Sequence, residues 1–244
     1  MACLPAAAAA ASTGGVAVRA ASVSPGGTAA GETAAGSAPA RHLHTAPVTS
    51  NSTNLAYSGP IYERTETGQV VPYVVAQASG ELKSLTGGAV AGQVAAPSKP
   101  ELLVPGSTAR YVDGLAAAPM GAPAAVQKIV WAANQIVGLP YIWGGGHASF
   151  SSPGYDCSGT VSFALHGGHL LSTPEDSSEF MAFGSHGVGR WVTIFTNPGH
   201  AYMTVAGLRL DTSSADDPSN QQGPRWRPLR PANEGFSVRH PTGF

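Results

Sequence analysis

Hydrophobic residues recur with helical spacing in the stretch that follows Pro123. The positions that share one face are Val126, Ile129, Val130, Ala133 and Val137. Apolar residues three or four positions apart form the buried stripe of an amphipathic helix. Proline suits the first turn of a helix, and Gly138 and Pro140 suit its end. The pattern therefore predicts a helix that begins near Pro123.

A second predicted helix begins at Cys157, directly after Asp156, whose carboxylate suits an N-cap. Val161 and Leu165 would share its buried face, and a Gly-Gly pair then stops it. A third, short helix is predicted to open within residues 173–176, where the spacing resembles a capping box.

After the helices, the pattern changes from helical spacing to alternation. The ranges 190–195, 200–206 and 208–212 each have the period of a strand, and Gly207 separates the last two. Helices followed by a meander of strands predict an α+β domain in which helices pack on an antiparallel sheet. We assign this domain to residues 122–244.

The first half of the chain has a different composition. Residues 13–121 are mostly Ala, Gly, Ser, Thr, Val and Pro, so they offer little apolar surface to offset the entropy of ordering. We expect a long low-complexity linker, largely disordered, except that residues 57–85 favour one or two strands or a segment wrapped on the domain. Residues 1–12 resemble the remnant of a secretion signal peptide; the alternative is an alanine-rich tail.

Charge and cysteine content exclude several classes of protein. The formal net charge is −1 and only 11% of residues are charged, so we expect no nucleic-acid partner. There is no apolar run of about 18 residues, so we expect no membrane span. If residues 1–12 are removed, Cys157 is the only thiol, which excludes an internal disulfide and a Cys-rich metal site. We predict a monomer with no metal and no cofactor.

The position of Cys157 suggests a reactive thiol. A helix N-terminus favours the thiolate, which is the nucleophilic form. The neighbours Ser158 and Gly159 are small and leave room for a substrate carbonyl, and backbone N–H groups at this turn can hold an oxyanion. The alternative is a buried, inert cysteine, which is common in protein cores.

His200 is the candidate base for this thiol, because it begins the alternating strand. If Ala206 and Gly207 form a two-residue turn, Asp211 becomes the diagonal neighbour of His200 on the same face, within side-chain reach. A carboxylate there orients the imidazole and stabilises its cation. The same register gathers the apolar side chains on the other face: Ala201, Met203, Val205, Leu208, Leu210 and Thr212.

Each of these two residues has a simpler interpretation on its own. His200 suits the solvated end of a strand, and Asp211 suits a salt bridge with Arg209 or a turn acceptor. The hypothesis depends on their conjunction: a cysteine at a helix start, a histidine at a strand start and an aspartate on the same face.

The motifs LPYIWGGG, YDCSG and GHAYMTVAGLRLDTS resemble those of NlpC-type cell-wall peptidases, which are papain-like cysteine hydrolases. The resemblance covers about residues 123–215. It implies a nucleophile at Cys157, a general base at His200 and an orienting residue at Asp211. It also implies that Tyr141 lines the site near the oxyanion, and we group Ser158 and Asp156 with it as substrate or oxyanion residues.

The resemblance further implies a function and a location. The expected substrate is the stem peptide of peptidoglycan, cleaved at an amide bond by a secreted or cell-wall-associated bacterial enzyme. An acyltransferase or amidase on the same fold, or a wall-associated scaffold with an inactive site, are the alternatives. The third catalytic position is usually His, Asn or Gln in this family, whereas this chain has Asp211.

Two features lie beside the family pattern. His147 is close in sequence to Cys157, so it either enters the site or is incidental to it. Trp226, with Arg225 and Arg227 on either side, either lines a groove for an acidic muropeptide or packs the C-terminal tail onto the domain.

Overall fold

Two β-sheets and two α-helices make up the described part of the protein. The computed structural model describes residues 57–73, 98–215, 220–230 and 233–244. All of these residues fall within one unit of the chain, residues 44–244. The protein is thus of mixed α+β class, as predicted. The expected signal remnant, residues 1–12, lies outside the described residues.

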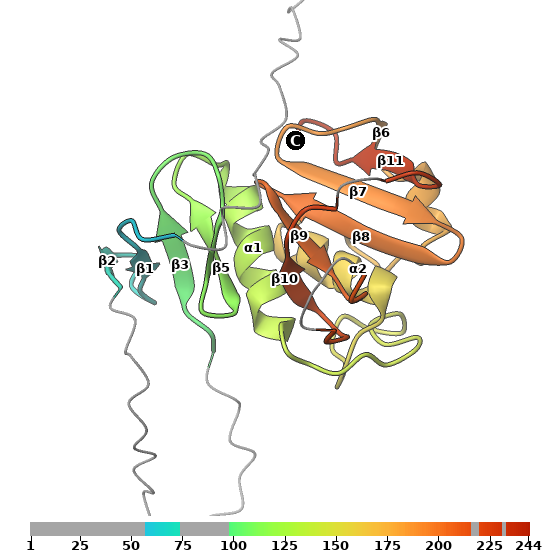
Figure 1. Cartoon of the computed structure of the whole chain (residues 1–244), viewed down its shortest axis with the longest axis horizontal. Helices are drawn as coiled ribbons and strands as arrows, with labels where there is room; N and C mark the ends of the chain where they lie inside the picture. Colours follow the sequence, from blue (N-terminus) through green and yellow to red (C-terminus); the bar gives the residue numbers. More distant parts are fainter. Residues whose placement is uncertain (1–56, 74–97, 216–219, 231–232) are drawn as a thin grey trace, which may run out of the picture. The chain divides into compact units, whose positions relative to one another are not determined.

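The larger sheet has six strands, in the order β10-β9-β8-β7-β11-β6, and every neighbouring pair is antiparallel. Its central meander, β7 to β9, confirms the strands predicted from alternation (Figure 1). The strands are β6 (Ser185–His186), β7 (Val192–Asn197), β8 (His200–Val205), β9 (Leu208–Asp211), β10 (Arg225–Arg227) and β11 (Ser237–His240).

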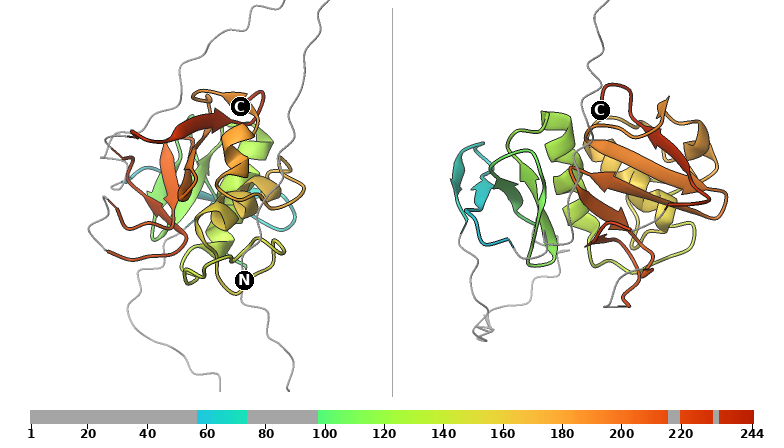
Figure 2. Two further views of the ribbon diagram at one scale, coloured as in Figure 1. Left: turned by 90° about the vertical axis from the view of Figure 1, so that its right-hand side faces the viewer. Right: turned by 45° about the horizontal axis from the view of Figure 1, so that its top comes forward.

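The two predicted helices are α1 (Ala124–Ile136) and α2 (Cys157–Gly167). They pack against each other, and α2 packs on β8, so the apolar face of the β8–β9 hairpin is buried with them in one core. Figure 2 shows both helices beside the six-stranded sheet. Full burial of each large apolar side chain in this core contributes about 1.5–3 kcal/mol.

The third predicted helix is a single short 3-10 segment, η2 (Glu179–Ala182). It starts at Glu179, so the predicted opening within residues 173–176 is wrong; the turn before it is closed by Asp176, whose Oδ1 accepts the Glu179 N–H at 2.9 Å, and by Glu179 Oε2, which accepts the Asp176 N–H at 2.7 Å. Phe180 is fully buried in the core, and Phe183 packs against it.

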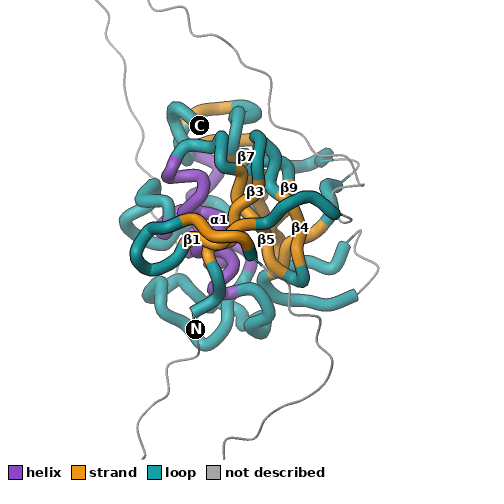
Figure 3. Tube along the Cα trace, turned by 90° about the vertical axis from the view of Figure 1, so that its left-hand side faces the viewer, coloured by secondary structure: helices purple, strands orange, loops and turns teal. Residues whose placement is uncertain are grey.

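The smaller sheet was predicted only in part, and it corrects the expected linker. Its order is β2-β1-β3-β5-β4, and its pairs are antiparallel except for β3 with β5, which is parallel. Beneath it lies α1, which packs on β5 (Figure 3). The strands are β1 (Tyr62–Arg64), β2 (Val70–Pro72), β3 (Glu101–Val104), β4 (Arg110–Val112) and β5 (Leu115–Pro119).

This sheet moves the start of the folded unit upstream. The prediction of a linker up to residue 121 is wrong for residues 98–121, which form β3, β4 and β5, whereas the strands expected within residues 57–85 are present as β1 and β2. Leu103, Ala116 and Ala118 share the core of α1, so residue 122 is not a domain boundary. The rest of the expected linker lies outside the described residues.

Asn134 on α1 joins the two sheets. It is 0% exposed, and its side chain accepts the Ala116 N–H at 2.9 Å and donates to the Ala116 carbonyl at 2.8 Å. The same Oδ1 accepts the indole N–H of Trp226 on β10 at 2.8 Å. A buried amide that is fully bonded in this way fixes β5 and β10 to one point of the helix.

Within the described residues, no helix has both the length and the apolar character needed to cross a bilayer.

Candidate functional site

The first turn of α2 places Cys157 directly behind the helix N-cap. Asp156 is the cap, as predicted: its Oδ1 accepts the Gly159 N–H at 2.8 Å. Its Oδ2 accepts the Gly144 N–H at 3.0 Å, which ties the preceding loop to the helix. Unpaired N–H groups and the helix dipole favour an anion at this end of the helix. Cys157 therefore lies where a thiolate is stabilised.

Glycines let the loop over residues 144–146 pass directly against α2. Gly144 and Gly146 have φ angles of 72° and 90°, which side chains disfavour. A Cβ on Gly159 would overlap the carbonyl oxygen of Gly145, so the helix and the loop touch backbone to backbone. The glycine-rich motif and the Asp-Cys-Ser-Gly motif are thus two halves of one packed unit.

His200 begins β8 after a tight turn in which Asn197 Oδ1 accepts the His200 N–H at 2.9 Å. Val205 pairs with Leu208, which is the predicted register. His200 Nε2 lies 3.0 Å from Asp211 Oδ1, so the predicted diagonal pair is in contact. The side-chain alternation along the hairpin therefore brings these two residues together.

The thiol of Cys157 lies near the imidazole of His200 and the backbone N–H of Ala201, and both of them lower its pKa. Because His200 Nε2 bonds Asp211, Nδ1 is the ring nitrogen left for the thiol. Cys157 begins α2 and His200 begins β8. The two residues are 43 positions apart in the sequence, but they lie close together in the fold. The structure brings the predicted nucleophile, base and orienting residue together, with His200 between Cys157 and Asp211.

The pKa values of the two central groups shift in opposite directions. Burial raises the pKa of Cys157, but the hydrogen bonds from His200 and Ala201 outweigh burial and lower the pKa below its ordinary 9.0. Burial lowers the pKa of His200, whereas its hydrogen bonds to Asp211 and Cys157 raise the pKa to about 9. These opposite shifts both favour the thiolate–imidazolium pair.

Asp211 is buried and held from several directions. Its Oδ1 also accepts the Ser213 N–H at 2.9 Å, and Oδ2 lies 3.6 Å from Nη1 of the buried Arg209. Arg227 Nε donates to the Asp211 carbonyl at 3.1 Å. The salt bridge and the turn acceptor considered as alternatives are both present, together with the bond to His200. These contacts fix the carboxylate in position.

The opposite wall of the site is also anchored to α2. Ser162 Oγ donates to the Glu175 carbonyl at 3.1 Å and accepts the Glu175 N–H at 3.0 Å. Two residues further on, Ser177 Oγ donates to the Pro198 carbonyl at 3.3 Å. These bonds hold the segment that leads into η2 against the turn before β8.

A cleft of about 260 Å³ opens above the thiol. Its lining residues are Trp143, Gly144, His147, Asp156, Cys157, Ser158, Asp176, Ser177, Ser178, Pro198 and Gly199. Trp143 is 85% exposed and forms an aromatic rim. Tyr141 is near enough that burial first, and then the charges of Cys157 and Asp156, raise its pKa. Its hydroxyl therefore stays a proton donor beside the thiolate.

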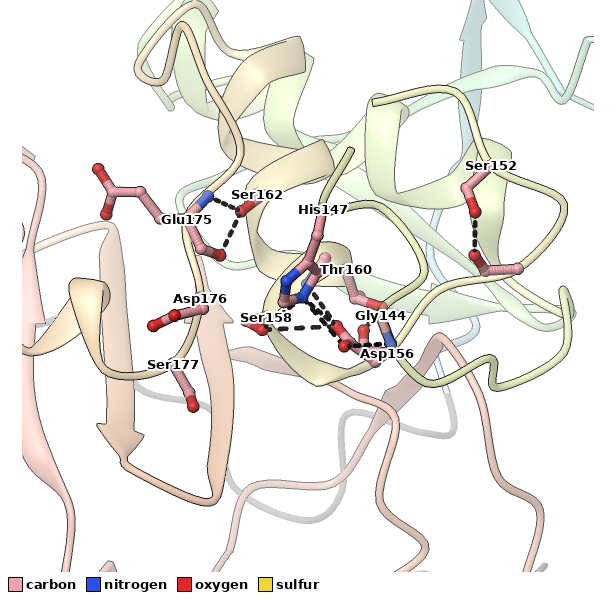
Figure 4. Close-up of polar contacts among 12 residues, drawn as sticks. Gly144, His147, Ser152, Asp156, Ser158, Thr160, Ser162, Glu175, Asp176 and Ser177 are labelled. Atoms are coloured by element: carbon pink, nitrogen blue, oxygen red, sulfur yellow. Dashed lines mark hydrogen bonds and ion pairs between the residues drawn. The ribbon is translucent and has the colours of Figure 1, made fainter. Parts of the chain in front are cut away.

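His147 is the cleft residue that the sequence left undecided, and the structure places it inside the site. Its Nε2 lies 3.0 Å from each carboxylate oxygen of Asp156 and 3.1 Å from Ser158 Oγ (Figure 4). The signal in the sequence was its position, nine residues before Asp156 in a glycine-rich loop. The side chain of Ser158, grouped with the substrate residues, is buried in this cluster.

The C-terminal basic motif packs the tail instead of lining a groove. Trp226 is 4% exposed, and Arg227 is fully buried, with Nη2 donating to the Gln221 and Gly223 carbonyls. Burial lowers the pKa of Arg227, while the charge of Asp211 raises it. Arg227 therefore supports the backbone around Asp211.

No family model matches the chain, and no curated protein matches it either. In the described part of the chain, no group of three or more His, Cys, Asp or Glu side chains is arranged to hold a metal ion.

Proposed function

We propose that this protein is a papain-like cysteine hydrolase of the NlpC type that cleaves an amide bond in the stem peptide of peptidoglycan. One observation carries the proposal: the imidazole of His200 contacts the Asp211 carboxylate at 3.0 Å and lies near enough to the Cys157 thiol to lower its pKa. The resemblance of the surrounding motifs supplies the substrate class. The proposal includes a bacterial protein that acts as a monomer, secreted or associated with the cell wall.

The first half of the reaction uses the ion pair directly. The Cys157 thiolate attacks the carbonyl carbon of the amide, and the carbonyl π electrons move to oxygen to give a tetrahedral oxyanion. His200, protonated, gives its Nδ1 proton to the leaving nitrogen as the C–N bond breaks. The products of this half are a free amine and a thioester on Cys157. Asp211 stabilises the imidazolium before the proton is transferred.

The second half restores the enzyme. The neutral imidazole of His200 accepts a proton from water as the water oxygen attacks the thioester carbonyl. Collapse of the tetrahedral intermediate breaks the C–S bond, which releases a carboxylic acid and regenerates the thiolate and imidazolium. Asp211 keeps the imidazole in the same orientation for both proton transfers, since its carboxylate stays bonded to Nε2.

The oxyanion has candidate donors on two sides. Backbone N–H groups in the first turn of α2 point away from the helix, and the Tyr141 hydroxyl keeps its proton beside the thiolate. Asp156 supports this arrangement through its bonds to the Gly159 and Gly144 N–H groups. The role of Asp156 is therefore to hold the helix start and the loop together.

Acyl transfer and amidase chemistry share the same thioester and remain alternatives to peptide hydrolysis. They differ in what attacks the thioester or in which amine leaves, so the masses of the products separate them. An inactive scaffold is the third alternative, and the complete chain from Cys157 to Asp211 argues against it.

Digestion of purified cell wall tests the proposal. The wild-type protein is expected to release soluble muropeptides, identified by mass spectrometry, and Cys157→Ala is expected to release none while retaining the circular-dichroism spectrum. His186→Gln, at an exposed position on β6, is the matched control and should release as much as the wild type. Equal release by wild type and Cys157→Ala contradicts a thiol-dependent hydrolase, and binding without release by the wild type favours the scaffold.

A further inference from the structure

A second imidazole lies in the cleft, on the loop side of the nucleophile. His147 is 34% exposed, and its Nε2 contacts both carboxylate oxygens of Asp156 and the hydroxyl of Ser158. These two residues flank Cys157 in the sequence and in the first turn of α2. Figure 4 shows the ring of His147 directed at Asp156 and Ser158. Asp176 and Ser177, which also line the cleft, lie on a separate segment.

The Asp156 carboxylate creates a local electrostatic problem for the site. It is needed as the N-cap and as the acceptor for Gly144 and Gly159, so it cannot be moved away. It is also a negative charge next to a thiol that has to ionise, and this charge raises the pKa of Cys157. A donor that binds both carboxylate oxygens disperses this charge. His147 Nε2–H is such a donor.

We propose that His147 is a positioning residue that holds Asp156 against the first turn of α2 and offsets its charge beside the Cys157 thiolate. The inference rests on the proposed function, because it assigns His147 a part in forming the nucleophile. His147 acts through Asp156 and makes no proton transfer to substrate. The site then has one imidazole on each side of the sulfur: His200 pairs with the thiolate, and His147 pairs with the neighbouring carboxylate.

Several charged or titratable groups face this part of the site and belong in the same account. From β8, His200 stabilises the thiolate, and Asp211 of β9 acts behind it. From the loop before α2, the charge of Cys157 raises the pKa of Tyr141. Across the cleft, the Asp176 carboxylate accepts backbone N–H groups of its own turn. His147, by contrast, bonds the Asp156 carboxylate directly.

The test measures the rate at which iodoacetamide alkylates Cys157 as a function of pH, which requires no peptidoglycan. In His147→Ala, the rate at neutral pH is expected to fall roughly three- to tenfold, with the midpoint of the profile moved to higher pH. His147→Gln, whose amide can still donate to the carboxylate, is expected to recover part of the rate. His186→Gln is the control and should follow the wild-type profile.

A double-mutant cycle with Asp156→Asn shows whether His147 acts through the carboxylate. Asparagine keeps an N-cap but removes the charge, so His147→Ala should change the alkylation rate little in that background. A merely structural His147 would lower folded protein without moving the pH midpoint. An unmoved midpoint in both His147 variants, or an undiminished effect of His147→Ala in Asp156→Asn, overturns the inference.

Wall digestion by the same variants separates this inference from the proposed function. His147→Ala is expected to lower kcat with little change in KM, because fewer molecules hold the thiolate. If the wild type digests no wall, the proposed hydrolase fails, while the alkylation profiles still decide the role of His147 at Asp156.

Discussion

Asp211→Asn is the substitution that tests the electrostatics of the proposed mechanism most fully. Asparagine keeps the shape of the side chain and an oxygen that can accept from His200 Nε2, but it removes the negative charge. In the wild type, burial lowers the pKa of His200, and the bonds to Asp211 and Cys157 raise it from 6.5 to about 9. This shift corresponds to about 3 kcal/mol in favour of the imidazolium.

The expected effect follows from replacing a charge-assisted hydrogen bond by a neutral one, a loss of about 1–2 kcal/mol. The pKa of His200 should then fall by about one unit. Acylation needs the imidazolium, so activity is lost as the pH rises through this pKa. The basic limb of the activity profile should therefore move down from near 9 by about one pH unit. The acidic limb, which reports thiolate formation, should move up, because a less charged His200 stabilises the thiolate less.

The assay is the pH dependence of kcat/KM for release of muropeptides, with the His200 imidazole titrated by NMR. Asp113→Asn is the control, because Asp113 is exposed in a turn of the smaller sheet. Loss of the charge beside the buried Arg209 is also expected to lower the free energy of unfolding, so the profile is measured where the variant is fully folded. A basic limb at the wild-type pH in Asp211→Asn refutes the assigned role of the carboxylate.

Three further predictions concern the packing that positions the site. Asn134→Leu should lower the free energy of unfolding by about 2–4 kcal/mol in urea denaturation, because Ala116 and Trp226 lose buried partners; an unchanged denaturation midpoint would show that the joint is dispensable. Trp226→Phe should also lower the free energy of unfolding, because it removes the bond to Asn134 and leaves a cavity where the buried indole packed; an unchanged denaturation midpoint would contradict this role. Gly159→Ala should lower the melting temperature or prevent folding, because its Cβ meets the Gly145 backbone; a normal melting temperature would show that the loop yields.

Much of the site could be predicted because its geometry follows from local patterns. The side-chain period of a strand is two, so a two-residue turn at Ala206 and Gly207 sufficed to bring His200 and Asp211 to one face. The N-cap preference of Asp placed the start of α2, and with it Cys157. The contact between Cys157 and His200 is long-range, so local patterns could only suggest it through the conjunction of a helix-start cysteine and a strand-start histidine, which the resemblance then supported.

The strand β5 of the smaller sheet escaped prediction because it carries small side chains. Ala116 and Ala118 face the core of α1, while Ala117 faces a second cluster, so alternation is present but both faces are alanine. A pattern of apolar and polar positions cannot appear where both faces are buried and apolar. The composition resembled that of a linker for the same reason.

The role of His147 escaped prediction because it depends on backbone geometry that the residue pattern does not encode. The loop that carries it turns through positive φ at Gly144 and Gly146, and this path brings the ring back over Asp156. The sequence left open whether Arg227 is buried, because the backbone carbonyls that its guanidinium bonds carry no signal in the sequence.

The central claim is that Cys157 is held as a thiolate by His200, and a titration of the thiolate tests it most directly. Ultraviolet absorbance of the thiolate is followed against pH in the wild type and in His200→Gln, with Cys157→Ser subtracted as the blank. We predict a midpoint clearly below the ordinary thiol pKa of 9.0 in the wild type and a higher midpoint in His200→Gln. Two coincident curves at or above the ordinary value would contradict the account.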